Sequence, residues 1–148
     1  MKNVRGSPWK GRIMNDNVIA LLEESRSREK EQALFYRLLA AEAGTSGSEG
    51  LADRFNDLHA DEQHHVSRLT ARIFEMSGTP AQAPRPSVSI PDLDAWEEEA
   101  RSREEREVAW YREVLSKPLD DITRGIVEEI LASEEHHARK LAGKWMSA

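Results

Sequence analysis

The chain repeats itself, and this repeat limits the folds that it can adopt. Residues 25–39 read SRSREKEQALFYRLL, and residues 100–115 read ARSREEREVAWYREVL, at an offset of 75 positions. A second pair of segments is HADEQHHVSRL, beginning at His59, and LASEEHHARKL, beginning at Leu131, at an offset of 72 positions. The offsets differ by only three residues, which the loops can absorb. The sequence therefore predicts two similar helical hairpins.

Four segments rich in Ala, Leu, Glu and Arg are predicted to be helices, because these residues favour helix and no proline lies inside the segments. We expect the helices at 15–43, 49–76, 91–116 and 120–146. No β-type alternation persists, so the predicted fold is an all-α bundle. Residues 1–14 form a basic arm, which we expect either to be disordered or to dock on a partner.

The connection between the two hairpins is long and rich in proline. Residues 77–91 read SGTPAQAPRPSVSIP, with four prolines. An extended chain rises about 3.1 Å per residue, so this stretch spans about 45 Å. A helix of about 26 residues is only about 39 Å long. We therefore expect the linker, residues 77–90, to run the length of the bundle and start the third helix from the far end. The alternative is a disordered tether between hairpins 15–76 and 91–146.

Each predicted helix carries an apolar stripe that is interrupted in its middle by carboxylates or histidine. Burying an unpaired carboxylate costs several kcal/mol, so such a layer needs ion pairing or metal coordination. Within each hairpin the two glutamates lie at similar distances from the turn, within about one helical turn of each other. A bound cation would compensate the whole layer, which consists of Glu29, Glu62, His65, Glu104, Glu134 and His137.

The spacing of these residues suits a metal site. Glu62 and His65 are three residues apart, as are Glu134 and His137. Side chains at this spacing lie on one helix face and reach a common point. Two such pairs, with one Glu from each of two further helices, make the ligand set of di-metal bundles. Carboxylate oxygens with a few imidazole nitrogens suit iron or manganese, and zinc is also compatible.

The segments REKEQALFY, DEQHH, REEREVAWY and SEEHH resemble the rubrerythrin-type branch of the ferritin-like superfamily, over roughly residues 15–146. The resemblance implies a ferritin-like four-helix bundle in which the six residues of the layer bind two iron ions. Rubrerythrins often carry one more Glu a turn after the third-helix ligand, and Glu107 fits that place, where the first hairpin has Gln32. Glu107 is then either a redox-dependent ligand or a surface charge.

Several nearby residues are candidates for supporting roles. Tyr36 and Tyr111 each follow a predicted ligand by seven residues, and we expect their hydroxyls near the site, in the core or in a redox role. Asp61 is a candidate hydrogen-bond partner for a ligand histidine, a contact that metal sites usually need. His64 and His136 point about 100° away from the layer and are expected at the surface.

The resemblance implies a dinuclear-iron oxidoreductase that reduces hydrogen peroxide or dioxygen, with electrons from ferrous iron or an external donor. Rubrerythrins commonly carry a rubredoxin-like domain with cysteine-bound iron, but this chain has no cysteine. The same ligands would also serve an iron-handling or sensor module without turnover. A third interpretation is a structural bundle whose polar layer is neutralised by arginines.

Composition excludes some other classes. No apolar run approaches the roughly 18 residues of a membrane span. The net charge of −6 argues against a nucleic-acid partner, because phosphate contacts need clustered Lys and Arg. The absence of cysteine excludes disulfides and thiol catalysis. We expect a cytoplasmic protein that forms a homodimer.

Overall fold

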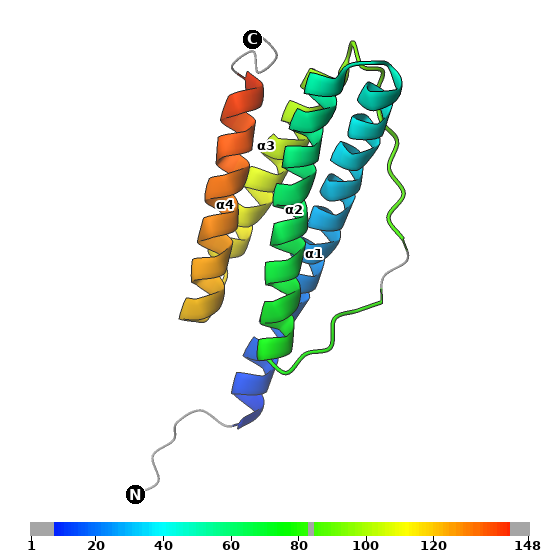
Figure 1. The fold of residues 1–148 in the computed structure, drawn as a ribbon. Coiled ribbons are helices and arrows are strands. Elements are labelled where there is room, and N and C mark those ends of the chain that lie inside the picture. Colours follow the sequence, from blue (N-terminus) through cyan, green and yellow to red (C-terminus); the bar gives the residue numbers. More distant parts are fainter. Residues whose placement is uncertain (1–7, 83–84, 143–148) are drawn as a thin grey trace, which may run out of the picture.

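A computed structural model describes residues 8–82 and 85–142 of the chain. Within these residues the secondary structure is helical, without strands, and the all-α prediction is confirmed. Figure 1 shows the helices packed side by side in a bundle. They are α1 (Pro8–Thr45), α2 (Glu49–Glu75), α3 (Trp96–Leu115) and α4 (Asp121–Ala142).

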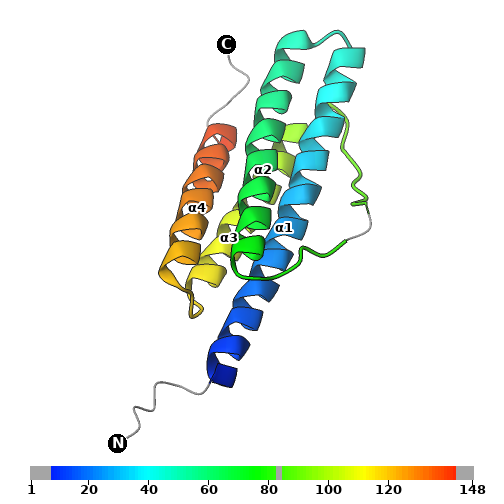
Figure 2. The ribbon, with the colours of Figure 1, turned by 60° about the horizontal axis from the view of Figure 1, so that its bottom comes forward.

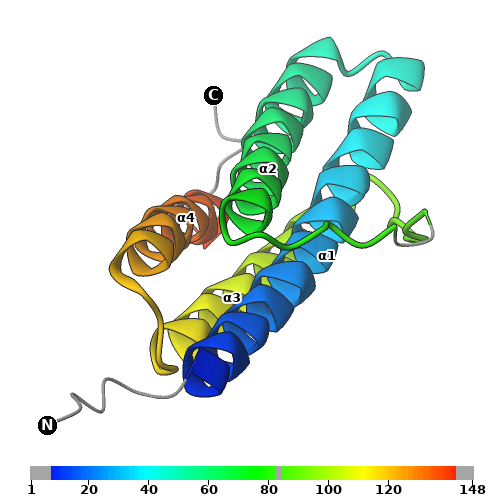
Figure 3. The ribbon, with the colours of Figure 1, turned by 90° about the horizontal axis from the view of Figure 1, so that it is seen from below.

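The linker between α2 and α3 determines the topology of the bundle. It runs along the outside of α1 and returns the chain to the end where α2 begins, as Figure 1 shows. As a result α3 runs in the same direction as α2, and α4 in the same direction as α1. Viewed from below in Figure 3, α1 lies beside α2 and α3, and α4 lies beside the same two helices. The predicted pair of hairpins with a long crossover is confirmed.

Two helices begin several residues away from their predicted starts, whereas α2 begins as predicted and α4 begins one residue later. α1 begins at Pro8 rather than at residue 15, because proline suits the first turn of a helix, where its missing N–H is not needed. This extra part of α1 projects beyond the other helices, as Figures 1 and 2 show. Residues 1–7 of the expected basic arm, and residues 143–148, lie outside the described residues.

α3 begins at Trp96 rather than at residue 91. The backbone N–H of Ala95 donates to the carbonyl of Asp92 at 2.9 Å and closes a turn before the helix starts. Leu93 in this turn packs against the core. The proline-rich linker therefore ends in a short turn, and the buried Trp96 is the first residue of α3.

The apolar core is divided into two clusters, one near each hairpin turn. We call them the first-turn cluster, near the connection of α1 and α2, and the second-turn cluster, near the connection of α3 and α4. The first-turn cluster contains Phe35, Tyr36, Leu39, Ala40, Ala43, Phe55, Leu58, Trp96, Ala100 and Leu141. The second-turn cluster contains Val18, Leu22, Leu69, Ile73, Tyr111, Val114, Leu119, Val127 and Ile130.

No helix in the described part of the chain combines the length and the apolar character needed to cross a membrane.

A polar contact joins the end of α2 to the start of α4. Arg72 donates from Nη2 to Asp120 Oδ2 at 2.6 Å and from Nε to the hydroxyl of Thr123 at 3.0 Å. Asp120 Oδ2 also accepts the backbone N–H of Thr123 at 3.1 Å, which caps α4. The two hairpins are thereby fastened together at the end of the bundle opposite the first-turn cluster.

Candidate metal centre

Each of the four helices contributes one fully buried carboxylate to a layer between the two clusters. Glu29 on α1, Glu62 on α2, Glu104 on α3 and Glu134 on α4 are all 0% exposed. The apolar residues on both sides of the layer keep water away from it. Four acids in a space of this kind repel one another strongly unless protons or cations compensate them.

Two overlapping groups of side chains in this layer bring their oxygen and nitrogen atoms close together. Within each group, one candidate ligand atom from every residue lies within 4.8 Å of the others. Glu62 and Glu134 belong to both groups, so the two groups adjoin along a shared pair of carboxylates. The first group is Glu29, Glu62, His65 and Glu134, and the second is Glu62, Glu104, Glu134 and His137.

Both histidines direct Nδ1 toward the layer. His65 Nδ1 lies 3.0 Å from Glu134 Oε1 and 3.4 Å from Glu29 Oε2. His137 Nδ1 lies 3.3 Å from Glu62 Oε1 and 3.6 Å from Glu104 Oε1. Each histidine therefore contacts one carboxylate of its own hairpin and one of the two shared carboxylates of the layer.

Two tyrosines each donate a hydrogen bond to a glutamate of the other hairpin. The accepting glutamates are the two that are not shared between the groups. The Tyr36 hydroxyl of α1 donates to Glu104 Oε1 at 2.5 Å, and the Tyr111 hydroxyl of α3 donates to Glu29 Oε1 at 2.7 Å. Burial and the neighbouring carboxylates raise the pKa of both tyrosines well above the usual value, so the hydroxyls remain protonated donors. The structure thus brings both predicted tyrosines to the layer.

The shared carboxylates have unsatisfied oxygens. Neither oxygen of Glu62 or of Glu134 has a hydrogen-bond partner in the described structure. Burial, followed by repulsion from the other carboxylates, raises the pKa of both groups well above the usual value. Buried polar atoms normally have partners, and only one oxygen of each carboxylate has a histidine Nδ1 within 3.3 Å, so this pair of acids requires a cation or protons. The donor set of oxygens and imidazole nitrogens fits a pair of metal ions.

The His137 ring is also held from outside the layer. Its Nε2 lies 2.9 Å from Asp61 Oδ2, the contact considered for Asp61 from the sequence. Burial opposes a positive charge on His137, but hydrogen bonds with Asp61 and Glu104 outweigh burial and raise its pKa to about 9. The hydrogen bond to His137, against the opposing effect of burial, lowers the pKa of Asp61. Asp61 thereby fixes the orientation of one histidine.

Glu107 lies at the edge of the layer and in neither of the two groups. It is 8% exposed, so it is not a surface charge, and its Oε1 is 3.5 Å from Arg28 Nη1. Burial and repulsion from Glu29 raise the pKa of Glu107 to about 7, although Arg28 opposes the shift.

Gln32, the counterpart of Glu107 in the first hairpin, donates from Nε2 to Glu104 Oε1 at 3.2 Å. Sequence reasoning missed this hydrogen bond, although the repeat places Gln32 and Glu107 at equivalent positions. The arginines of the RSRE segments were considered from the sequence as partners of the layer, and one of them, Arg28, does pair with Glu107. Its guanidinium also lies over the Trp110 ring at 4.4 Å, a contact that the sequence did not indicate.

The remaining histidines lie outside the layer. His64 and His136 are exposed, as predicted from the helix period. His59 is half-buried on the outer side of the first hairpin, and its Nδ1 donates to the backbone carbonyl of Ala33 at 2.8 Å. Of each HH pair, one histidine therefore points to the layer and the other to solvent.

Comparison with known proteins agrees with this geometry. A family model described as Rubrerythrin matches residues 20–144. The fold is similar to that of Rhodobacter capsulatus bacterioferritin, whose structure is described with a metal-free dinuclear site and haem iron. The TM-score is 0.79 at 21% sequence identity, over 86% of this chain and 82% of that chain. At this identity the likeness establishes the fold alone. No curated protein matches the sequence significantly.

Proposed function

The chain belongs to the rubrerythrin family, and on that basis we propose that it is a non-haem diiron oxidoreductase that reduces hydrogen peroxide or dioxygen. The observation that carries the proposal is the pair of adjoining groups that share Glu62 and Glu134, whose buried oxygens make no hydrogen bond among the described residues. In a purely structural bundle these acids would have to stay protonated, whereas metal ions would compensate the whole layer.

The two groups suggest how the residues divide between two metal ions. Glu29 and His65 would hold one ion, Glu104 and His137 would hold the other, and Glu62 and Glu134 would contribute to both. When bound, iron supplies the electrons for reducing the oxidant and open coordination positions at which the oxidant binds. Manganese and zinc are compatible with the same donors.

The surrounding residues keep the layer oriented and dry. The hydroxyls of Tyr36 and Tyr111 hold one oxygen each of Glu104 and Glu29, so these carboxylates keep their positions when charge changes nearby. Asp61 holds the ring of His137. The apolar clusters on both sides limit access of water, which strengthens every charge interaction within the layer.

We assign access to the layer to a polar pocket of about 400 Å³ between α1 and α3. Its lining includes Gln32 and Glu107, which border the layer, and three arginines at positions 28, 103 and 106. Peroxide is small and polar, and such a lining suits it. Glu107 is the candidate seventh ligand, because it is buried at this edge and close enough to Glu29 to be affected by its charge.

We propose that the electrons come from ferrous iron or from an external donor; the 148 residues contain no cysteine that could bind a rubredoxin-type iron. The family membership supports iron handling more generally. An iron-binding module without turnover uses the same donor set and is separated from the oxidoreductase by its kinetics.

The test begins with anaerobic loading of the protein with ferrous iron and a count of bound metal. We expect about two ions per chain, the stoichiometry of this ligand design. Stopped-flow absorbance after mixing with peroxide or dioxygen then measures oxidation. Faster oxidation by peroxide supports a peroxidase and faster oxidation by dioxygen a ferroxidase, whereas inertness to both supports the iron-handling alternative.

Two histidine variants provide a matched pair for this test. His137→Ala removes a proposed ligand and should abolish the absorbance change, whereas His136→Ala removes the exposed neighbour and should preserve it. Metal content near zero in the wild-type protein, or wild-type turnover in His137→Ala, would reject the assignment.

A further inference from the structure

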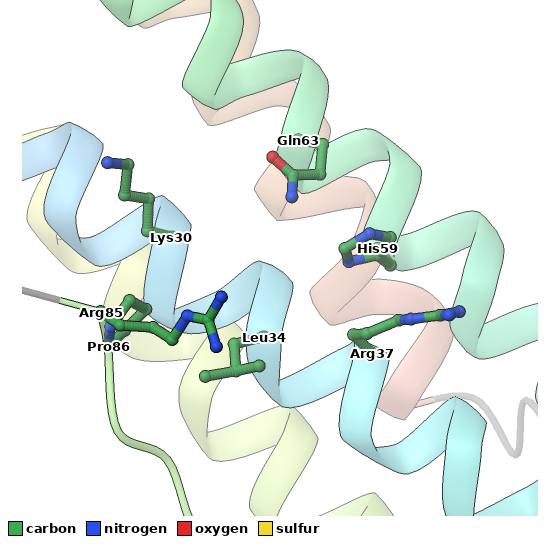
Figure 4. Close-up of a pocket in the computed structure, with 7 residues that line it drawn as sticks. All are labelled: Lys30, Leu34, Arg37, His59, Gln63, Arg85 and Pro86. Atoms are coloured by element: carbon green, nitrogen blue, oxygen red, sulfur yellow. The ribbon is translucent and has the colours of Figure 1, made fainter.

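A second cavity lies on the outer face of the first hairpin, on the side of α1 and α2 that faces away from α3 and α4. Its volume is about 610 Å³, and the crossover linker forms one of its walls. Figure 4 shows the Arg85 side chain reaching from the linker toward α1, and the Gln63 side chain coming from α2. The lining residues are Lys30, Leu34, Arg37, His59, Gln63, Arg85 and Pro86.

The cavity gathers three cations that no carboxylate neutralises. Among the described residues, Lys30 and Arg85 form no ion pair, and Arg37 donates only to the neutral amide oxygen of Asn56, at 3.1 Å. The protein as a whole is acidic, with 27 Asp and Glu against 21 Lys and Arg. Three unpaired cations around one cavity therefore stand out from their surroundings and favour an anionic ligand.

The second hairpin offers an internal comparison, because the repeat places a groove at the equivalent position. That groove has a volume of about 290 Å³ and is lined in part by Glu105, Arg112 and Glu135. These three residues are the counterparts of Lys30, Arg37 and Gln63 in the repeat. Arg112 is paired with Glu135 at 3.1 Å, so the second groove is neutralised by its own side chains.

The linker wall is attached to the bundle on both sides of the cavity. On one side, Arg26 Nη1 donates to the carbonyl of Ala81 at 3.1 Å, and the Ala81 N–H donates to Glu23 Oε1 at 3.0 Å. On the other side, Val88 and Ile90 pack against the first-turn cluster. These attachments hold Arg85 near α1.

The opposite wall is also held in place. Because the carbonyl of Ala33 can only accept, the hydrogen bond with His59 requires a proton on Nδ1 and anchors the ring at the cavity wall.

We propose that this cavity binds a small phosphate-bearing molecule, with its phosphate on Arg85 and its organic part against Leu34 and Pro86. Lys30 and Arg37, whose side chains extend in opposite directions in Figure 4, add positive charge on either side. A phosphate monoester carries a charge of about −1.5 to −2 at pH 7 and three acceptor oxygens, which matches several cations better than a single carboxylate does. Arginine pairs with phosphate through two parallel hydrogen bonds. The volume lies in the usual range for small-molecule sites.

The test uses isothermal titration calorimetry of the full-length, metal-loaded protein with phenyl phosphate and with benzoate as probes. We expect saturable binding of phenyl phosphate at least about 10-fold tighter than that of benzoate. Arg85→Ala should weaken phenyl phosphate binding about 10-fold or more, and Lys30→Ala should weaken it by a smaller factor, because Lys30 contributes charge to the same cavity. Arg85→Gln keeps a polar side chain but removes the charge, and should weaken binding similarly.

Two control variants test whether phosphate binds at this cavity rather than elsewhere on the protein. Arg112→Ala removes the equivalent cation of the second groove and should change the affinity by less than about twofold, within the usual effect of a remote surface charge. Glu62→Gln, which alters a ligand shared by both groups and should remove both ions, should leave phenyl phosphate binding intact, which excludes phosphate held by iron. Circular dichroism verifies that each variant is folded.

Four outcomes would overturn the proposal. The first is failure of phenyl phosphate to bind the folded wild-type protein. The others are benzoate binding as tightly as phenyl phosphate, an unchanged affinity in folded Arg85→Ala and Lys30→Ala, and an equal loss in Arg112→Ala. None of these results depends on whether the metal centre turns over.

Discussion

The two halves of the metal layer are built from the same repeat, yet they differ at one position beside the ligands. In one half, Gln32 donates a hydrogen bond to Glu104. At the equivalent position of the other half, Glu107 places a second acid near Glu29 and is itself held by Arg28. The repeat therefore specifies the positions of the ligands, while single substitutions beside them give each half a different charge.

A second difference lies on the outer side of the histidines. Asp61 on α2 contacts Nε2 of His137, whereas its counterpart on α4, Ser133, makes no hydrogen bond with His65 in the described part of the chain. The tyrosines, in contrast, keep the symmetry, because each donates to the Glu of the opposite hairpin. The two proposed metal positions therefore have equivalent ligands, but among the described residues only one ligand histidine is held by a carboxylate on its outer side.

The largest effect is expected from a residue that both halves share. Glu62→Gln should reduce bound metal from about two ions per chain to near zero, because Glu62 belongs to both groups. Glu29→Gln or Glu104→Gln, which each alter one group, should leave about one ion. Elemental analysis after anaerobic loading measures the difference. The exposed Glu128→Gln on α4 is the control, and two ions retained in Glu62→Gln would contradict the shared-ligand assignment.

The next effect concerns the acid that breaks the symmetry. Since folding raises the pKa of Glu107 from 4.5 to about 7, its stabilising contribution is complete below pH 4.5 and disappears as pH rises through 7. Chelator-treated wild-type protein should therefore be less stable at pH 8 than at pH 5. In Glu107→Gln this loss should be smaller by roughly 1–3 kcal/mol.

Urea denaturation at the two pH values measures that change, and Glu105→Gln on the exposed side of α3 is the control. Burial of Glu62 and Glu134 acts in the same direction, so part of the loss should remain in the variant. Identical pH dependence in Glu107→Gln and wild type would show that Glu107 is not the source of the difference between the halves.

A smaller effect is expected from the outer support of the histidines. Asp61→Asn should weaken metal affinity by roughly 10- to 100-fold, the usual cost of losing a carboxylate that orients a ligand histidine. Ser133→Ala, at the equivalent position of the other half, should have little effect. Competition with a chromophoric chelator gives both metal affinities. Equal losses of affinity in the two variants would contradict the proposal that only Asp61 orients a ligand histidine.

The smallest effect separates the two tyrosines. Tyr36→Phe and Tyr111→Phe should each cost on the order of 1.5 kcal/mol of unfolding free energy, because a hydrogen bond to a carboxylate is lost. The loss should be greater for Tyr111→Phe, since Glu104 keeps the Gln32 donor when Tyr36 is changed. Thermal denaturation of the metal-free variants measures the two losses of stability. A greater loss in Tyr36→Phe would contradict the proposal that Gln32 remains a donor to Glu104.

Much of the fold could be predicted from the sequence, because helix period and linker length are local properties. The stripes correctly indicated that Glu29, Glu62, Glu104 and Glu134 are buried in one layer, and that one histidine of each pair points to it. The prolines of the linker correctly indicated the crossover. The start of α3 was wrong by five residues, because a local turn at Asp92–Ala95 competes with the helix.

Other features depend on how the hairpins meet and could not be read from one helix at a time. The hydrogen bond from Tyr36 of α1 to Glu104 of α3 forms only because these two helices pack against each other in antiparallel directions. The pairing of Arg28 with Glu107 depends on the same register. The outer cavity depends on the path of the linker, because Arg85 lines the same cavity as Lys30 and Arg37 only when the chain passes along α1.

The crossover linker also has a thermodynamic consequence. It is the covalent connection between two hairpins that each supply half of the centre, so the bundle behaves as a tethered dimer. A flexible tether sets an effective concentration of one half around the other, on the order of millimolar for short linkers. If the linker were cut, assembly of the centre would become bimolecular and would depend on protein concentration. The affinity of this protein for its metal thus includes the free energy of bringing two half-proteins together.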